Sequence, residues 1–171
     1  MSATNDPILN LPASPTAPVL FDRGVLSNFY QAPIMLPCPY TGTIREFPST
    51  EHYFQAAKVA PFYKAQGKLQ RYLAVAHAAS AGLAKKLAGR AACPLPADLR
   101  AHWDHGGSFA AMLTACRAKF RQHPELRTLL LATGSRLLIE HRPDPTWGDN
   151  LDGTGRNLLG LVLMVVREEL R

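Results

Sequence analysis

Residues 48–58 read PSTEHYFQAAK, and this stretch predicts the start of the helix around which the chain is organised. Ser49 can accept a hydrogen bond from one of the unpaired backbone N–H groups of a first helical turn, so we expect it to be the N-cap. Pro61 has no N–H to donate, so we expect the helix to end there. The sequence therefore predicts a short helix.

This helix carries an acid, an amide and an amine on one stripe. At about 100° per residue, Glu51, Gln55 and Lys58 lie at offsets of roughly 0°, 40° and −20° around the axis. A carboxylate in the first turn is favoured by the helix dipole, and a primary amine two turns later is a candidate nucleophile. The alternative is an ordinary solvated face, since such residues are usually exposed.

Length and composition predict one soluble domain. The chain has 171 residues, 47% of them hydrophobic. It has no apolar run of the roughly 20 residues that a membrane helix needs, and its first residues do not resemble a secretion signal. Three widely spaced cysteines, an odd number, favour free thiols over a disulfide framework. We therefore expect a cytoplasmic protein without a membrane partner.

The charge predicts an anionic partner. The net charge is +6 at pH 7 and the cations form no basic run, which favours a local phosphate pocket over a dedicated DNA-binding surface. Lys86 and Arg90 are four residues apart beside Gly89 and could clamp an anion. Alternatively, they only complement the negative end of a helix dipole.

Proline-rich residues 1–18 are too poor in apolar side chains to order themselves, so we expect a flexible arm before a domain at residues 19–171. Residues 24–30 predict a turn, in which Asn28 bonds either local backbone or a ligand. The rest predicts a mainly α-helical α+β domain with a small β-hairpin or sheet. We expect strands at residues 34–36, 43–47 and 136–141, and helices at 69–79, 81–87, 97–105, 108–122 (capped by Ser108), 124–132 and 158–170.

Two further polar features are candidate sites. His102 and His105 are three residues apart, but no third ligand follows at a convincing spacing, so no metal site is expected. The polar loop at residues 144–157 holds Trp147 among aspartates and glycines. An indole in such a loop suits a platform on which a ring stacks. The alternative is a tryptophan that fills the core beneath a turn.

Several segments, in order, resemble the NADAR superfamily, which includes the YbiA-like N-glycosidases. No single segment is decisive, but the ordered set is specific. The segments lie at residues 24–30, 49–58, 84–90, 118–120, 122–124, 130–134, 144–148 and 155–160, together with Met164 and Arg167.

The resemblance implies a mainly helical α+β hydrolase that cleaves an N-glycosidic bond to ribose, without a metal or redox cofactor. The implied substrate is a phosphorylated ribosylamino-pyrimidine of the riboflavin pathway. The alternative is ADP-ribose attached to guanine in DNA or RNA. By matching position, Glu51 is the key acid, Lys58 the candidate amine, and Asp144 a third catalytic residue that borders the sugar.

Other residues are expected to contact such a substrate: Asn28, Phe29, Gln55, Lys86, Arg90, Trp103, Trp147, Gly148 and Asn157. An arginine that the family has shortly after Trp103 falls here at Gly107 or Ser108, and the family's second glycine after Trp147-Gly148 is replaced by Asp149-Asn150. The absence of that arginine leaves the phosphate ligands open. A non-catalytic ADP-ribose-binding module is the alternative of another class, and a carboxylate in an anion site argues against it.

Overall fold

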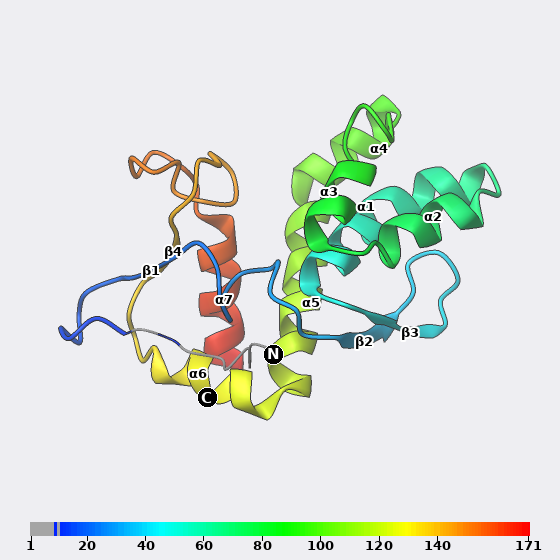
Figure 1. The fold of residues 1–171 in the computed structure, drawn as a ribbon. Helices are drawn as coiled ribbons and strands as arrows, with labels where there is room; N and C mark the ends of the chain where they lie inside the picture. The colour runs from blue at the N-terminus through cyan, green and yellow to red at the C-terminus, as the bar shows by residue number, and fades with distance from the viewer. Residues whose placement is uncertain (1–8, 10) are drawn as a thin grey trace, which may run out of the picture. The chain divides into compact units, whose positions relative to one another are not determined.

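The computed structural model describes residue 9 and residues 11–171. Residues 1–8 and 10, which make up half of the predicted arm, lie outside the described part. The chain has the mainly helical α+β architecture predicted from the sequence (Figure 1). In order, the elements are β1 Val19–Phe21, β2 Ile34–Pro37, β3 Ile44–Phe47, α1 Thr50–Ala65, α2 Leu69–Ala76, α3 Ala81–Leu87, α4 Ala97–His102, a π-helical turn at Trp103–Gly107, α5 Ser108–Gln122, α6 Pro124–Ala132, β4 Leu138–Glu140 and α7 Leu158–Glu169.

The described chain falls into two compact units. Unit 1 combines the segment that ends at Tyr30 with Phe120–Arg171, and unit 2 is Gln31–Lys119. Each unit has a two-stranded sheet of its own.

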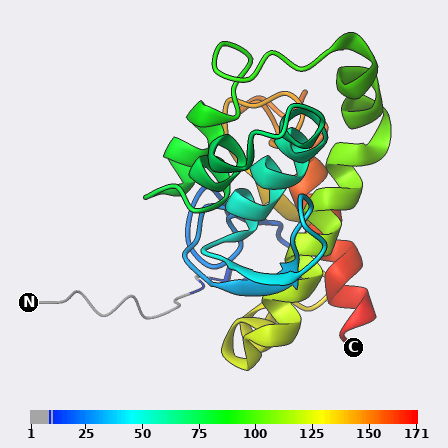
Figure 2. The same ribbon diagram turned by 90° about the vertical axis from the view of Figure 1, so that its right-hand side faces the viewer.

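Unit 2 is built on the predicted hairpin. β2 and β3 pair antiparallel, with Ile34 opposite Phe47. Helices α1, α2 and α3 pack on one another, and Figures 1 and 2 both show them gathered on one side of the hairpin. Small residues such as Ala56 and Ala60 lie fully buried on α1 and let these elements approach closely.

The prediction that Pro61 ends α1 is wrong, because the helix continues to Ala65 with Pro61 inside it. An interior proline costs a helix about 3 kcal/mol. The residues beyond it offset that cost, since Tyr63 is buried in the core of unit 2 and Phe62 packs against the same core. Burying a large apolar side chain contributes about 1.5–3 kcal/mol.

Unit 1 is built on a pairing between distant parts of the chain. β1 runs parallel to β4, with Val19 opposite Leu138, and α7 packs on β4 and on α6. The buried Arg167 of α7 donates to Thr133 Oγ1 at 2.7 Å and to the carbonyl of Arg136 at 2.9 Å. These two bonds tie α7 to the end of α6.

The other boundaries mostly agree with the prediction. The hairpin, α3, α5, α6 and α7 are where the sequence placed them, whereas α2 and β4 are shorter than predicted. Ser108 is not an N-cap, since its φ and ψ of −63° and −46° are helical and the chain enters α5 from the π-helical turn. Gly106, with φ +123°, breaks the helical path between α4 and α5.

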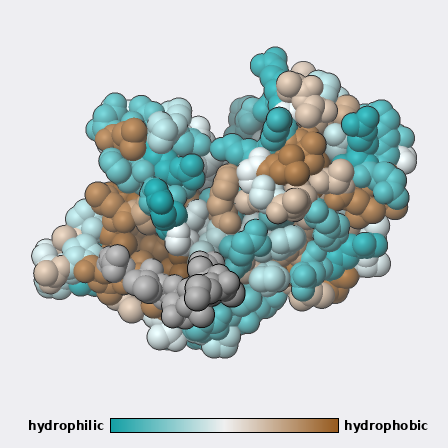
Figure 3. Space-filling model, in the orientation of Figure 1, coloured by the Kyte–Doolittle hydropathy of each residue, from teal (hydrophilic) through white to brown (hydrophobic). Residues whose placement is uncertain are grey.

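Hydrophilic side chains cover most of the face drawn in Figure 3, with hydrophobic ones gathered in smaller patches. Among the described residues, no helix combines the length and the apolar character needed to cross a bilayer.

Candidate active site

The first turn of α1 is fixed by a cap and a buried histidine. Ser49 Oγ accepts a bond from the backbone N–H of His52, as an N-cap does. The same oxygen lies 2.8 Å from His52 Nδ1, and His52 Nε2 lies 3.1 Å from the carbonyl of Ala78. His52 is fully buried, and burial lowers its pKa. A neutral ring that donates from Nε2 to the carbonyl satisfies both contacts, so this turn of α1 is held in one orientation.

Glu51 and Gln55, one helical turn apart on α1, form a buried pair. Gln55 Nε2 donates to Glu51 Oε1 at 2.8 Å. The two residues are only 2% and 4% exposed, so they are not part of a solvated face. Gln55 Oε1 is a buried acceptor with no hydrogen-bond partner among the described residues. Such an atom costs about 1–3 kcal/mol, and a ligand that donates an N–H or O–H would satisfy it.

Lys58 follows on the same stripe. Its Nζ donates to the carbonyl of Ala88, directly after α3, at 2.9 Å. Burial lowers the pKa of Lys58 below its ordinary value, and the positive charge of Arg100 lowers it further, while Cys93 and Glu51 act in the opposite direction. The amine is therefore neutral at a lower pH than that of an exposed lysine, as a nucleophilic lysine requires.

A cavity of about 180 Å³ opens beside Lys58 within unit 2. Trp103 and His102 line it together with Lys58, and the apolar Leu99 and Ala111 complete much of the wall. The ring of Trp103 rests on Phe54, with the centroids 4.9 Å apart. Trp103, which was predicted to contact the substrate, and the predicted amine Lys58 thus share one cavity wall, which does not include Glu51 or Gln55.

Lys86 and Arg90, the two cations predicted to bind an anion together, do not lie on the same helix. Lys86 lies in the last turn of α3, but Arg90 follows after the helix has ended at Leu87, and both side chains are exposed. Their role in phosphate binding stays a prediction. His102 and His105 have no third partner for a metal, since the described residues contain no group of three His, Cys, Asp or Glu side chains that could hold an ion.

In unit 1, the loop after β4 carries Trp147, and the backbone of this loop is hydrogen-bonded to the side chain of Asp144. Asp144 Oδ1 accepts from the N–H groups of Thr146 and Trp147, both at 2.9 Å. Trp147 is half-buried, which fits neither a fully buried plug nor a free platform. Asp144 therefore orders the start of the loop that presents the indole.

Two other predicted binding residues of this loop have structural roles. Asn157 accepts from the N–H of Glu140 at 3.0 Å and donates to the carbonyl of Leu138 at 2.8 Å, so both ends of its amide are used by β4. A Cβ on Gly148 would lie 2.9 Å from the carbonyl oxygen of Glu140. Contact of Asn157 and Gly148 with a substrate stays a prediction.

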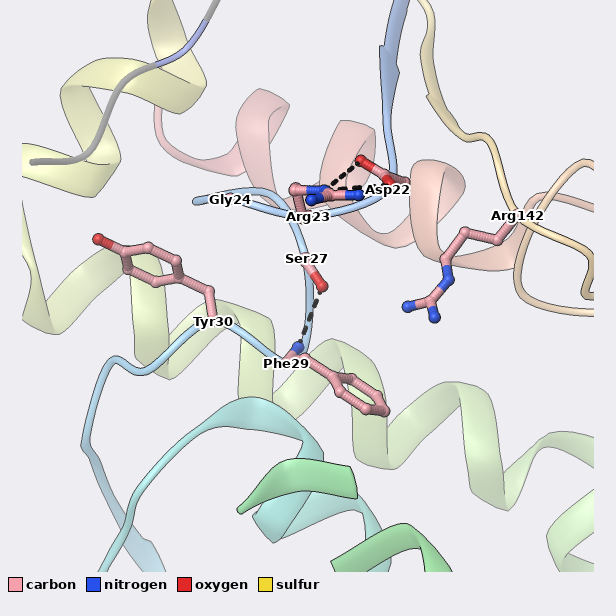
Figure 4. A pocket seen from close by; sticks show the side chains of 7 residues that line it. All are labelled: Asp22, Arg23, Gly24, Ser27, Phe29, Tyr30 and Arg142. Atoms are coloured by element: carbon pink, nitrogen blue, oxygen red, sulfur yellow. Dashed lines mark hydrogen bonds and ion pairs between the residues drawn. The ribbon is translucent and has the colours of Figure 1, made fainter. Parts of the chain in front are cut away.

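The predicted residues Asn28 and Phe29 lie half-buried in the turn that follows β1. Phe29 lines a second cavity, within unit 1, and the guanidinium of Arg142 lies over its ring at 5.7 Å from the centroid (Figure 4). Arg142 is not among the residues predicted from the sequence. It precedes Asp144 by two residues, and only the folded chain brings it to residue 29.

Comparisons with known proteins agree with this architecture. The NADAR domain model matches residues 20–171. N-glycosidase YbiA of Shigella flexneri serotype 5b is 37% identical over 150 residues, which are 87% of this chain and 82% of that protein. An N-glycosidase of Nostoc punctiforme is 34% identical over 149 residues, 86% of each chain.

Two further relatives extend the comparison. A riboflavin biosynthesis protein of Vibrio vulnificus is 37% identical over 88% of this chain and 36% of its own length. The NMR structure of Escherichia coli YbiA superposes with a TM-score of 0.70 and 32% identity, covering 99% of this chain and 93% of that one. The chain therefore belongs to the NADAR domain family.

Proposed function

We propose that this protein is a hydrolase that cleaves the N-glycosidic bond between ribose and a nitrogen base. The observation that carries the proposal is the stripe on α1, where the buried Glu51–Gln55 pair is followed by Lys58 with its lowered pKa. The names of the relatives support the same reaction, since YbiA and the Nostoc protein are both called N-glycosidases.

The reaction needs a proton for the leaving nitrogen and an electron pair for the anomeric carbon. In the proposed path, Glu51 in its acid form gives a proton to the ring oxygen, the C1–O bond breaks to open the ribose, and the lone pair of an amine-linked base forms an iminium bond to C1. The neutral amine of Lys58 adds to C1, and the carboxylate of Glu51 takes up the proton that the amine loses. The C–N bond to the base then breaks, with Glu51 supplying the proton that the leaving amine takes up.

Water completes the cycle. It adds to the Schiff base between Lys58 and C1, and collapse of the adduct releases the sugar as its aldehyde and restores the amine. Glu51 takes the proton that the attacking water loses. The proposed role of Gln55 is to orient this carboxylate through its N–H and to accept a substrate hydroxyl or amine on its unpartnered oxygen.

The proposed substrates are the ribosylamino-pyrimidine phosphates of riboflavin synthesis. The relatives called riboflavin biosynthesis proteins support this class, and the net charge of +6 suits a phosphorylated ligand. Their bond to ribose runs through an amino nitrogen, as the proposed iminium step requires. ADP-ribosylated guanine in DNA or RNA is the alternative substrate, and it meets this requirement where the ribose is joined to the exocyclic amine of the base.

The remaining residues have supporting roles in the proposal. Trp103, which lines the cavity beside Lys58, is proposed to stack on the base. Asp144 and Trp147 are proposed to border the sugar and ring, and Lys86 and Arg90 to contribute charge for phosphate.

The test is to incubate the purified protein with a ribosylamino-pyrimidine phosphate and, separately, with DNA carrying ADP-ribosylated guanosine, and to identify the products by mass spectrometry. Release of the free base and sugar phosphate from the first substrate supports the proposal, and release from the DNA alone selects the alternative substrate. Calorimetric binding of ADP-ribose without turnover of either substrate would instead make the protein a binding module.

A further inference from the structure

A second cavity, of about 360 Å³, lies within unit 1. Its wall comes from the turn after β1 and from the segment after β4, and it includes Asp22, Arg23, Ser27, Phe29, Tyr30 and Arg142. The volume is near the lower end of the roughly 300–1,000 Å³ that small-molecule sites occupy. It therefore has room for more than a bare inorganic ion.

The guanidinium of Arg142 lines this cavity and has no ion-pair partner within the part of the chain that the structure describes. It lies 5.7 Å from the centroid of the Phe29 ring, and Figure 4 shows the two side chains directed toward each other. Among the described residues, no side-chain hydrogen bond or ion pair of Arg142 is present, and the residue is half-buried. A partly desolvated arginine with five unused donors is suited to the planar, bidentate recognition of phosphate or carboxylate oxygens.

Asp22, the acid among the described residues of the wall, is already paired with Arg23. Arg23 Nε lies 3.2 Å from each oxygen of Asp22, and Arg23 Nη2 lies 3.0 Å from Oδ2. Two cations, Arg23 and Arg142, and one anion, Asp22, leave the wall with a charge of +1. The ring of Phe29 holds the remaining cation in place through a cation–π contact.

We propose that this cavity is a phosphate-binding subsite for a phosphorylated ribose ligand, and that Arg142 is the residue that binds the phosphate oxygens. The cavity volume fits a sugar phosphate, and the excess positive charge selects the phosphorylated form. The inference deepens the proposed function, on which it rests for the identity of the sugar.

Isothermal titration calorimetry of the full chain with ribose 5-phosphate, ADP-ribose and unphosphorylated ribose tests this. The wild type is expected to bind the first two and not ribose. A hydrogen-bonded charge pair is typically worth about ten- to hundredfold in affinity, so R142A is expected to weaken phosphate binding by that factor and R142K by less. Stronger binding of ribose 5-phosphate identifies a monoester as the ligand, and stronger binding of ADP-ribose a diphosphate.

Two further variants separate the site from a general charge effect. Arg71 is exposed on α2, in unit 2, so R71A removes the same charge and is expected to leave phosphate affinity unchanged. D22N removes the acid from the wall and is expected to tighten binding about two- to fivefold, as removal of an exposed like charge does. All variants are first checked for an unchanged thermal midpoint.

The proposal is overturned if R142A binds ribose 5-phosphate and ADP-ribose as the wild type does, if R71A weakens binding equally, or if the wild type binds neither compound. Because these are binding measurements, they do not depend on turnover. A protein that binds ribose 5-phosphate or ADP-ribose through Arg142 but releases no base would contradict the proposed function. The same result would support the phosphate-binding subsite.

Discussion

Gln55 donates its side-chain N–H to Glu51 across 2.8 Å, with both residues almost wholly buried. The bond uses one oxygen of the carboxylate and one donor of the amide. It leaves the amide oxygen of Gln55 without a partner among the described residues. A pair that served stability alone would satisfy that oxygen, since an unpaired buried acceptor is costly. The proposed function assigns an N–H or O–H of the substrate to this oxygen.

Because Gln55 is hydrogen-bonded to Glu51, the pH dependence of kcat/KM is expected to change when residue 55 is replaced. Q55E places a second carboxylate at hydrogen-bond distance from Glu51, and two carboxylates so close cannot both ionise readily. The limb of the kcat/KM profile that reports the ionisation of Glu51 is expected to move to higher pH by about one unit or more. The matched control is Q66E, at the exposed end of α1, which should leave the limb in place. An identical profile for Q55E and wild type would remove Glu51 from the proton-transfer role.

Lys58 is expected to form a covalent adduct during turnover. Borohydride added with substrate should trap the sugar on the wild-type chain, and peptide mass analysis should place it at Lys58. Since the pKa of Lys58 is lowered, trapping is expected to reach half its maximum at a pH below the ordinary lysine value of about 10.5. K58R keeps the positive charge but cannot form the Schiff base, so it should give no adduct. An adduct in K58R, or none in the wild type while base is released, would contradict the Schiff-base role of Lys58.

His52 is expected to make stability depend on pH. Its pKa is lowered in the folded state, so below about pH 6.5 the unfolded chain binds a proton that the folded chain resists. The stabilisation is complete above that pH and is lost as the pH falls, with a slope of at most about 1.4 kcal/mol per pH unit for one proton. Urea unfolding at a series of pH values measures it. H52Q should flatten the dependence, whereas H105Q, at an exposed histidine that plays no part in the pKa shift of His52, should keep it. An equal slope in H52Q would contradict the assignment.

Gly148 is expected to be irreplaceable for steric reasons. A Cβ there would lie 2.9 Å and 3.0 Å from the carbonyl oxygens of Glu140 and Arg142, so G148A should lower the free energy of unfolding by about 1–3 kcal/mol. Gly82 lies in α3, and a Cβ there would have its nearest neighbouring atom 4.0 Å away. G82A should therefore stabilise the protein by about 0.5–1 kcal/mol. Urea unfolding of both variants checks the pair, and a G148A protein as stable as the wild type would contradict the close approach.

Local patterns were enough to predict most of the helices and the hairpin. Ser49 marks the start of α1 through cap chemistry that acts within a few residues, and the two strands of the hairpin pair where the sequence predicted strands. The prediction that α1 ends at Pro61 failed because burial of Tyr63, a tertiary effect, outweighs the local cost of the proline. The parallel pairing of Val19 with Leu138 joins segments that no local pattern relates.

The sequence predicted which residues of the candidate site lie close together on one helix, but not how they are buried or paired. Helical spacing placed Glu51, Gln55 and Lys58 on one stripe. It could not show that the first two are buried, or that the amide oxygen of Gln55 has no partner among the described residues. Arg142 could not be predicted as a binding residue from the sequence. Its contact is the ring of Phe29, more than a hundred positions away in sequence, and only the structure shows that it has no ion-pair partner among the described residues.

The most direct test compares wild type with E51Q on a ribosylamino-pyrimidine phosphate, with the released base measured by mass spectrometry. Glutamine keeps the size of the side chain and can still hydrogen-bond to Gln55, but it cannot exchange a proton. General acid–base catalysis is worth about 10²–10⁴ in rate, so E51Q is expected to lose activity by that factor while its thermal midpoint stays near that of the wild type. Release of base by E51Q at the wild-type rate would contradict the assignment of Glu51 as the acid of an N-glycosidase.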